Sequence, residues 1–115
     1  MTGQKALFHI DRDDTSTFEL MMANIRNFLA DVGNADVAVV ANGAAVKLFV
    51  REISKKFEEE LNDLSRKGVK FYICENALRA HKIDKQDLFE FCELVPAGIT
   101  KIVALQNDGY AYIKP

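Results

Sequence analysis

Residues 35–43 read ADVAVVANG, a run of small and β-branched residues, apolar except for Asp36, that stops at an Asn-Gly pair. A continuous apolar run of this length, bounded by turn residues, is typical of a strand buried on both faces of a parallel sheet. Two other runs have the same character, ALFHI at residues 6–10 and VKFYI at residues 69–73. The chain therefore contains buried strands that need helices above and below them.

Helical patterns separate these strands. Apolar residues recur every three or four positions from Phe18 to Leu29, and again from Ile53 to Lys67, as on one face of a helix. A cap from Thr15, Ser16 or Thr17 is expected to begin the first of these helices. Further helices are predicted over residues 45–49, 76–80 and 85–94.

The C-terminal part is predicted to hold two more strands, Ile99–Gln106 and Tyr110–Ile113, joined by a turn at residues 107–109. Because the turn is tight, we expect the last strand to be antiparallel or an extension of the sheet edge. Strands that alternate with helices imply right-handed crossovers, and hence a mostly parallel five-stranded sheet with helices on both faces. The predicted class is α/β, with residues 1–115 forming one domain.

Composition excludes several classes of protein. Charged residues make up 28% of the chain, the formal net charge is −2 and the two signs are interspersed, so the basic stripe of a nucleic-acid-binding protein is missing. No apolar stretch approaches the roughly eighteen residues that span a bilayer. Residues 1–5 are short and polar and do not resemble a signal peptide, so we expect a soluble, cytoplasmic protein whose thiols stay reduced.

The ends of the predicted strands suggest where a ligand would bind. In an open parallel sheet, ligands gather at the carboxyl ends of the strands. The residues predicted there are His9, Asp11, Asn42, Gly43, Cys74, Glu75, Asn76, Gln106 and Asn107. Only Cys74 among them is a plausible nucleophile.

Cys74 falls between a predicted strand and a predicted helix. If its sulfur faces the free amides at the start of that helix, their partial positive charge favours the thiolate. Arg79 and Lys82 would add positive potential, and Glu75 would oppose it. A thiolate of this kind can take up sulfane sulfur and release it to an acceptor thiol. The alternative is that Cys74 is a small buried core residue.

The other polar residues have simpler interpretations. Cys92 is predicted on an amphipathic helix and is expected to belong to the core, although a role as resolving partner of Cys74 stays open. His9 is expected to be a packed, hydrogen-bonded histidine near the rim, and His81 to be exposed. These residues lack the spacing of a zinc site, and no glycine-rich nucleotide loop follows a strand. We therefore expect no metal and no cofactor.

Three segments are distinctive: VAVVANG at residues 37–43, GVKFYICENAL at residues 68–78 and VPAGITKIVALQNDGYAYIKP at residues 95–115. Together they resemble the DsrE/DsrF-like family of small sulfur-reduction and sulfur-relay proteins. The resemblance implies a three-layer α/β/α sandwich on a largely parallel five-stranded sheet. It also implies that Cys74 accepts a persulfide, that Asn42 and Gly43 lie beside the same crevice, and that the protein is a homo-oligomer, a trimer or a hexamer.

Two functions follow from these observations. The first is a sulfurtransferase or sulfur carrier that holds sulfane sulfur on Cys74 and exchanges it with a donor or acceptor protein. The second is a non-catalytic oligomeric binding module that uses the same crevice for a small ligand or a partner protein. The reactivity of the native thiol of Cys74 distinguishes them.

Overall fold

The computed structural model describes residues 3–115 and forms an α/β/α sandwich on a five-stranded sheet, as expected. The strands are β1 (Gln4–Ile10), β2 (Ala35–Ala41), β3 (Lys70–Cys74), β4 (Cys92–Val95) and β5 (Ala111–Ile113). They lie in the order β4-β3-β2-β1-β5, and every pairing is parallel. The connections from β1 to β4 run toward one edge of the sheet, whereas β5 is added on the opposite side of β1. The carboxyl ends of β1 and β5 are therefore the topological switch point of this sheet.

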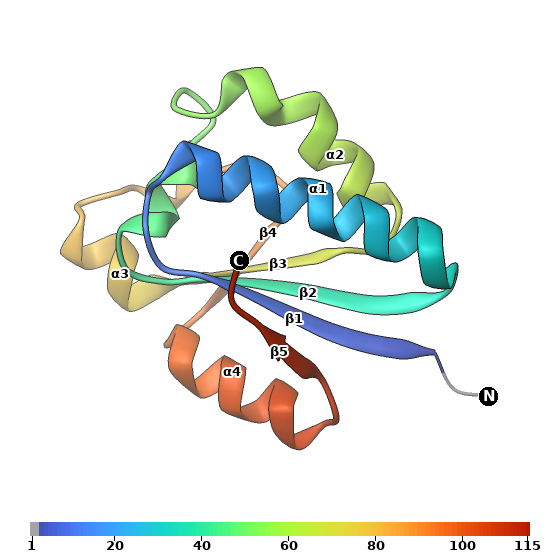
Figure 1. Ribbon diagram of the computed structural model, residues 1–115. Coiled ribbons are helices and arrows are strands. Elements are labelled where there is room, and N and C mark those ends of the chain that lie inside the picture. Colours follow the sequence, from blue (N-terminus) through green and yellow to red (C-terminus); the bar gives the residue numbers. More distant parts are fainter. Residues whose placement is uncertain (1–2) are drawn as a thin grey trace.

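Helices cover the two faces unequally (Figure 1). The α-helices are α1 (Thr15–Val32), α2 (Glu58–Arg66), α3 (Glu75–Ala80) and α4 (Gly98–Asn107), and 3-10 helices are η1 (Gly43–Phe49), η2 (Lys55–Phe57) and η3 (Lys85–Asp87). Helices α1 and α2 lie on one face, and α4 alone lies on the other. A large apolar core fills the first side, and a smaller cluster of Leu7, Ala38, Val40, Ile102 and Leu105 lies under α4.

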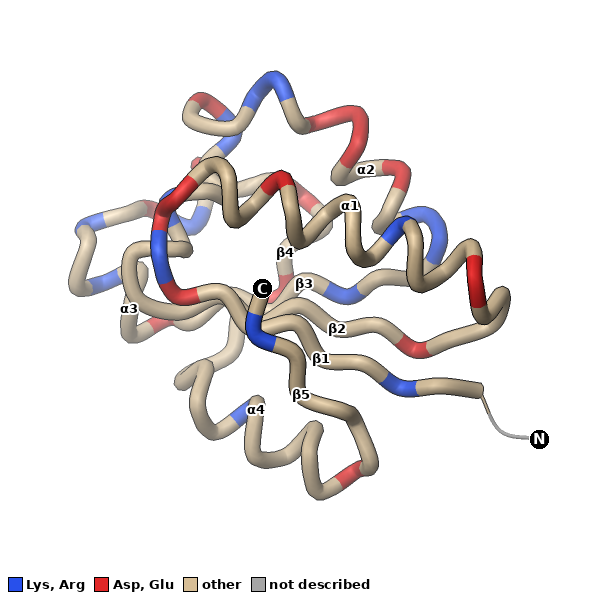
Figure 2. The backbone as a smooth tube through the Cα atoms, viewed as in Figure 1, with Lys and Arg blue, Asp and Glu red and all other residues tan. Residues whose placement is uncertain are grey.

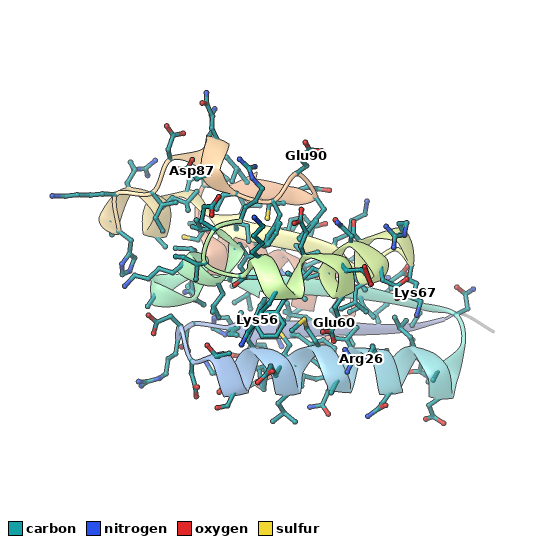
Figure 3. All side chains as sticks on the ribbon, turned by 90° about the horizontal axis from the view of Figure 1, so that it is seen from above. Arg26, Lys56, Glu60, Lys67, Asp87 and Glu90 are labelled. Carbon is teal, nitrogen blue, oxygen red and sulfur yellow. The ribbon has the colours of Figure 1, made fainter. Side chains whose placement is uncertain are left out.

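The N-terminal half follows the sequence pattern closely. Helix α1 buries Phe18, Met21, Met22 and Ile25, which are the first residues of its predicted apolar face. Its cap is Asp14, not one of the three hydroxyl residues that follow, because the Asp14 carboxylate accepts the backbone N–H of Ser16 at 3.1 Å. Helix α2 lies beside α1, where Arg26 and Glu60 face each other as an ion pair (Figure 3).

Two C-terminal predictions are wrong. The segment 85–94, predicted as a helix, is one turn of 3-10 helix followed by the edge strand β4. The segment 99–106, predicted as a strand, lies within α4. Ile102 and Leu105 face the sheet while Ile99 and Val103 remain more than half exposed. Since the apolar residues occur all round this helix, the sequence lacks the one-sided pattern that identifies a helix.

The last strand is at the sheet edge but is not antiparallel. Helix α4 crosses from β4 over the sheet to the far side of β1, so that β5 arrives parallel to β1, with Tyr112 opposite Leu7. Charged residues are sparse along α4, which carries Lys101 and is followed by Asp108, whereas they gather on α2 and on the β1–α1 turn (Figure 2). No helix within residues 3–115 is long and apolar enough to cross a membrane.

Candidate functional site

Three predicted site residues end three neighbouring strands. His9 is the penultimate residue of β1, Asn42 directly follows β2, and Cys74 is the last residue of β3. Ala41 pairs with Ile73, so in the same register the next two residues, Asn42 and Cys74, are neighbours. His9 pairs with Val40, and Cys74 with Val95. Side chains alternate along a strand, so this register directs all three toward the face that α4 covers.

His9 is held by hydrogen bonds on both sides of its ring. Its Nε2 lies 2.8 Å from Oδ1 of Asn42, and its Nδ1 lies 2.6 Å from the hydroxyl of Tyr112 on β5. The side chain is buried, with 6% of the residue exposed, and the ring of Tyr112 packs against it at 5.6 Å between centroids. His9 is thus the packed, hydrogen-bonded histidine that the sequence suggested, and it connects β5 to β2.

Cys74 is buried among apolar and polar neighbours. Only 5% of the residue is exposed; its Cβ faces the start of α4, and at the end of β3 it also packs against residues of the larger apolar core. It is the N-cap residue of α3, but its side chain makes no capping hydrogen bond. The backbone amide of Asn76 faces the carbonyl of Pro96 at 3.4 Å, so the first turn of α3 is partly paired with the β4–α4 connection.

Gly98 brings the N-terminus of α4 against this site. A Cβ atom built on Gly98 would lie 3.0 Å from Cβ of Asn42 and 3.4 Å from Cβ of Cys74. Helix α4 has ten residues, and its N-terminal amides carry the partial positive charge of the helix dipole. The N-terminus of α4 therefore lies against Cys74, which is itself the residue before the shorter α3.

A side chain at Gly98 is expected to destabilise the fold. The atoms that it would meet are Cβ atoms of Asn42 and Cys74, which move only with their strands. Overpacking of this kind costs about 1–3 kcal/mol, of which up to ~1 kcal/mol is offset by the smaller entropy of the unfolded chain. Gly98→Ala should lower the free energy of unfolding in urea by about 1 kcal/mol or more. Thr100→Ala, an exposed position in the same helix, is the control and should be nearly neutral.

Asp11 and Gly43 lie at the rim, but their contacts are with each other's backbone and with Lys114 near the C-terminus. Gly43 has a φ of +56°, and its built Cβ would lie 2.9 Å from the carbonyl oxygen of Asp11, so a side chain there is excluded on both grounds. The Asp11 carboxylate pairs with Lys114 at 2.7 Å. The hydrogen bond and charge of Lys114 hold the pKa of Asp11 below its usual value.

The pair between Asp11 and Lys114 gives a pH-dependent prediction. Because the folded pKa of Asp11 is lowered, the pair stabilises the fold above the unfolded value of about 3.9 and loses this contribution as the pH falls through the folded value. Both side chains are more than a third exposed, so the contribution is below about 1 kcal/mol. Lys114→Met should lower the free energy of unfolding slightly at neutral pH and not in acid. An equal difference at both pH values would contradict this assignment.

Glu75 and Asn76 do not join the group formed by His9, Asn42 and Cys74. The amide oxygen of Asn76 accepts a hydrogen bond from Arg79 within α3. Glu75 lines a separate cavity of about 160 Å³ with Leu78, Arg79, Ile83, Lys85 and Leu94. An apolar cavity of about 210 Å³ is lined by Val95, the strand partner of Cys74, and by Pro96, Ala97, Thr100, Lys101 and Ala104.

Cys92 is remote from Cys74. It lies on β4 and not on a helix as predicted, and it pairs with Phe71, three residues before Cys74. Three residues of strand span about 10 Å, beyond the roughly 7 Å that a disulfide tolerates between Cα atoms. Burial raises the pKa of the Cys92 thiol to about 12. Cys92 therefore does not resolve a modified Cys74 within one chain.

Sequence reasoning missed two residues of the site. Gly98 directly precedes the segment predicted as a strand and is in fact the first residue of α4, where a glycine permits close packing. Tyr112 was assigned only to a final strand, and its contact with His9 depends on a strand order that the sequence pattern does not reveal. Within residues 3–115, no three His, Cys, Asp or Glu residues gather closely enough to hold a metal ion.

Comparisons with known proteins give matches over nearly the whole chain. The model of the DsrE/DsrF-like family matches residues 5–115. A solved structure, that of the protein of unknown function MTH1491 from Methanobacterium thermoautotrophicum, is 37% identical and superposes with a TM-score of 0.91, covering 97% of this chain and 99% of that one. No curated protein matches the chain.

Proposed function

Because the chain belongs to the DsrE/DsrF-like family, we propose that it takes part in sulfur relay and carries sulfane sulfur as a persulfide on Cys74. Family membership supports sulfur relay in general. The observation that carries the finer proposal is the position of Cys74 at the carboxyl rim, beside Asn42 and the N-terminus of α4. An amide N–H donor and the positive end of a helix dipole both favour an anionic sulfur, and Asn42 and the start of α4 are close enough to Cys74 to supply them.

The proposed reaction is a transfer of one sulfur atom without net oxidation. The Cys74 thiolate attacks the terminal sulfur of a persulfide or polysulfide donor. A new S–S bond forms as the S–S bond of the donor breaks, and the bonding electrons leave with the donor as a thiolate or shorter polysulfide. The reverse step, attack by an acceptor thiolate on the outer sulfur of Cys74, releases the cargo. No metal or cofactor is required for either step.

The burial of Cys74 limits what can donate sulfur. With 5% of the residue exposed, a donor has to be small, or the β4–α4 connection over the site has to open before a partner protein can reach the sulfur. Inorganic polysulfide is therefore the appropriate first probe. Intact-mass spectrometry of the native protein after this treatment should show the gain of one sulfur atom, and a mass that stays unchanged would contradict the proposal.

A second function, that of a binding module, is favoured by the apolar cavity between β4 and α4. This cavity is lined by six residues from Val95 to Ala104 and does not include Cys74. Under this proposal, Cys74 is a core residue and the cavity accepts an apolar group of a ligand or partner. Binding that persists in Cys74→Ser, together with the absence of sulfur uptake, would favour this second function.

We also propose that the protein is a homo-oligomer. Ile99 and Val103 on α4, Leu20 on α1 and Ile53 before α2 are large apolar side chains that are more than half exposed. Pairing of such residues between subunits would remove apolar surface from water. Light scattering after size exclusion is expected to give the mass of a trimer or hexamer, and a monomer at micromolar concentration would contradict this proposal.

A further inference from the structure

Four polar or sulfur-bearing residues lie side by side on four neighbouring strands. Tyr112 on β5, His9 on β1, Asn42 at the end of β2 and Cys74 on β3 follow the order of the strands in the sheet. We propose that Tyr112 and His9 are positioning residues that set which end of the Asn42 amide faces Cys74. This inference rests on the proposed function of Cys74 as a sulfur carrier.

The distances assign the hydrogen-bond donors in this row. The contact of 2.6 Å between the Tyr112 hydroxyl and Nδ1 of His9 is shorter than N–H donors usually give and suits an O–H donor. The hydroxyl therefore donates to a bare Nδ1. The proton of a neutral His9 then resides on Nε2, which donates to Oδ1 of Asn42 at 2.8 Å, a usual length for N–H to O. Tyr112 thus favours one tautomer of His9.

The tautomer of His9 determines the orientation of the Asn42 amide. With Oδ1 held by His9 on β1, the NH2 group is the end of the same amide that does not face His9, and Cys74 lies on the other side of β2. Because Gly98 has no side chain, its backbone lies close to the Cβ atoms of both Asn42 and Cys74. With the opposite tautomer, the amide would turn over and present its oxygen to Cys74.

This orientation affects the chemistry of the sulfur. An N–H donor stabilises a thiolate and the persulfide anion, whereas an amide oxygen repels both. A hydrogen bond to a charged group corresponds to roughly a tenfold or larger change in equilibrium. The row would therefore offer an anionic sulfur on Cys74 an N–H donor without a charged side chain, at the edge of the sheet where β1 and β5 also end.

Nitrogen NMR of the His9 ring tests the assignment independently of sulfur chemistry. The nitrogen chemical shifts of a neutral imidazole distinguish its two tautomers. We expect the proton on Nε2 in the unsubstituted protein, and a mixture of tautomers in Tyr112→Phe. Tyr110→Phe, whose ring lies near Lys5, is the matched control and should leave the spectrum of His9 unchanged. A proton found on Nδ1 in the unsubstituted protein would overturn the inference.

The second measurement is the rate of sulfur uptake from inorganic polysulfide, with Cys92→Ser present in every protein. We expect uptake to slow several-fold in Tyr112→Phe and by roughly tenfold or more in Asn42→Asp, which replaces the NH2 group by a second oxygen. Tyr110→Phe should react at the unsubstituted rate. Urea unfolding of each variant confirms that the protein compared is folded.

The outcomes separate this inference from the function on which it rests. If the unsubstituted protein takes up no sulfur, both are overturned. If it takes up sulfur and all variants react equally fast, only the positioning role is overturned. The same holds if Tyr112→Phe slows uptake while the tautomer of His9 stays unchanged, because the effect would then come from the loss of packing alone.

Discussion

Cys74→Ser is expected to abolish sulfur uptake by the native protein, while Cys92→Ser is expected to leave it intact. The reason is the difference between the two sites. Cys74 lies beside Asn42 and the N-terminus of α4, whereas burial raises the pKa of the Cys92 thiol to about 12 and keeps it protonated. Intact-mass spectrometry after treatment with polysulfide should show one added sulfur atom in Cys92→Ser and none in Cys74→Ser.

The serine variants form a matched pair because each exchanges sulfur for oxygen within the core or at its edge. Equal uptake by both would show that sulfur binds elsewhere. Uptake that is lost only in Cys92→Ser would transfer the proposed role to β4 and contradict the assignment of Cys74. Peptide mapping of the modified protein gives the position of the sulfur directly.

Phe71→Ala is expected to cause the largest loss of stability. Phe71 is fully buried on β3, and its ring packs against Phe49 at 5.9 Å and Phe91 at 4.9 Å between centroids. Removing such a ring costs the transfer free energy of the lost atoms and leaves a cavity, about 3–5 kcal/mol in total. Because β3 also ends at Cys74, this packing holds the site residue in place.

Urea unfolding followed by circular dichroism measures this effect. Ile99→Ala is the control, since Ile99 is 57% exposed on α4 and its truncation should change the free energy of unfolding by about 0.5 kcal/mol or less. A loss below about 1 kcal/mol for Phe71→Ala would mean that the core between the sheet and η1 is not close-packed.

Sequence patterns predicted the first three strands and the helices between them because each segment has one dominant period. The run of residues 37–41 is continuously apolar, as a central parallel strand requires, and β2 lies at the centre of the sheet. The pattern fails after residue 80. Strand β4 has four residues and α4 has apolar residues on its exposed side, so neither shows a distinctive period.

The sequence predicted those residues of the site that lie at the ends of strands. His9, Asn42 and Cys74 follow from the rule that polar residues after parallel strands meet at one edge. The contribution of Tyr112 depends on β5 lying beside β1, and that of Gly98 on the helical form of the segment predicted as a strand. Both contacts come from long-range topology, which local patterns do not contain.

The central claim is that Cys74 reacts from within the folded protein. It is tested most directly by the rate at which its thiol is modified by inorganic polysulfide in Cys92→Ser, measured at increasing urea concentrations below the unfolding transition. Reaction from the native fold predicts a rate that is proportional to the polysulfide concentration and nearly independent of urea. A rate that rises with urea in step with the population of unfolded protein would show that Cys74 reacts only after unfolding, and would contradict the account.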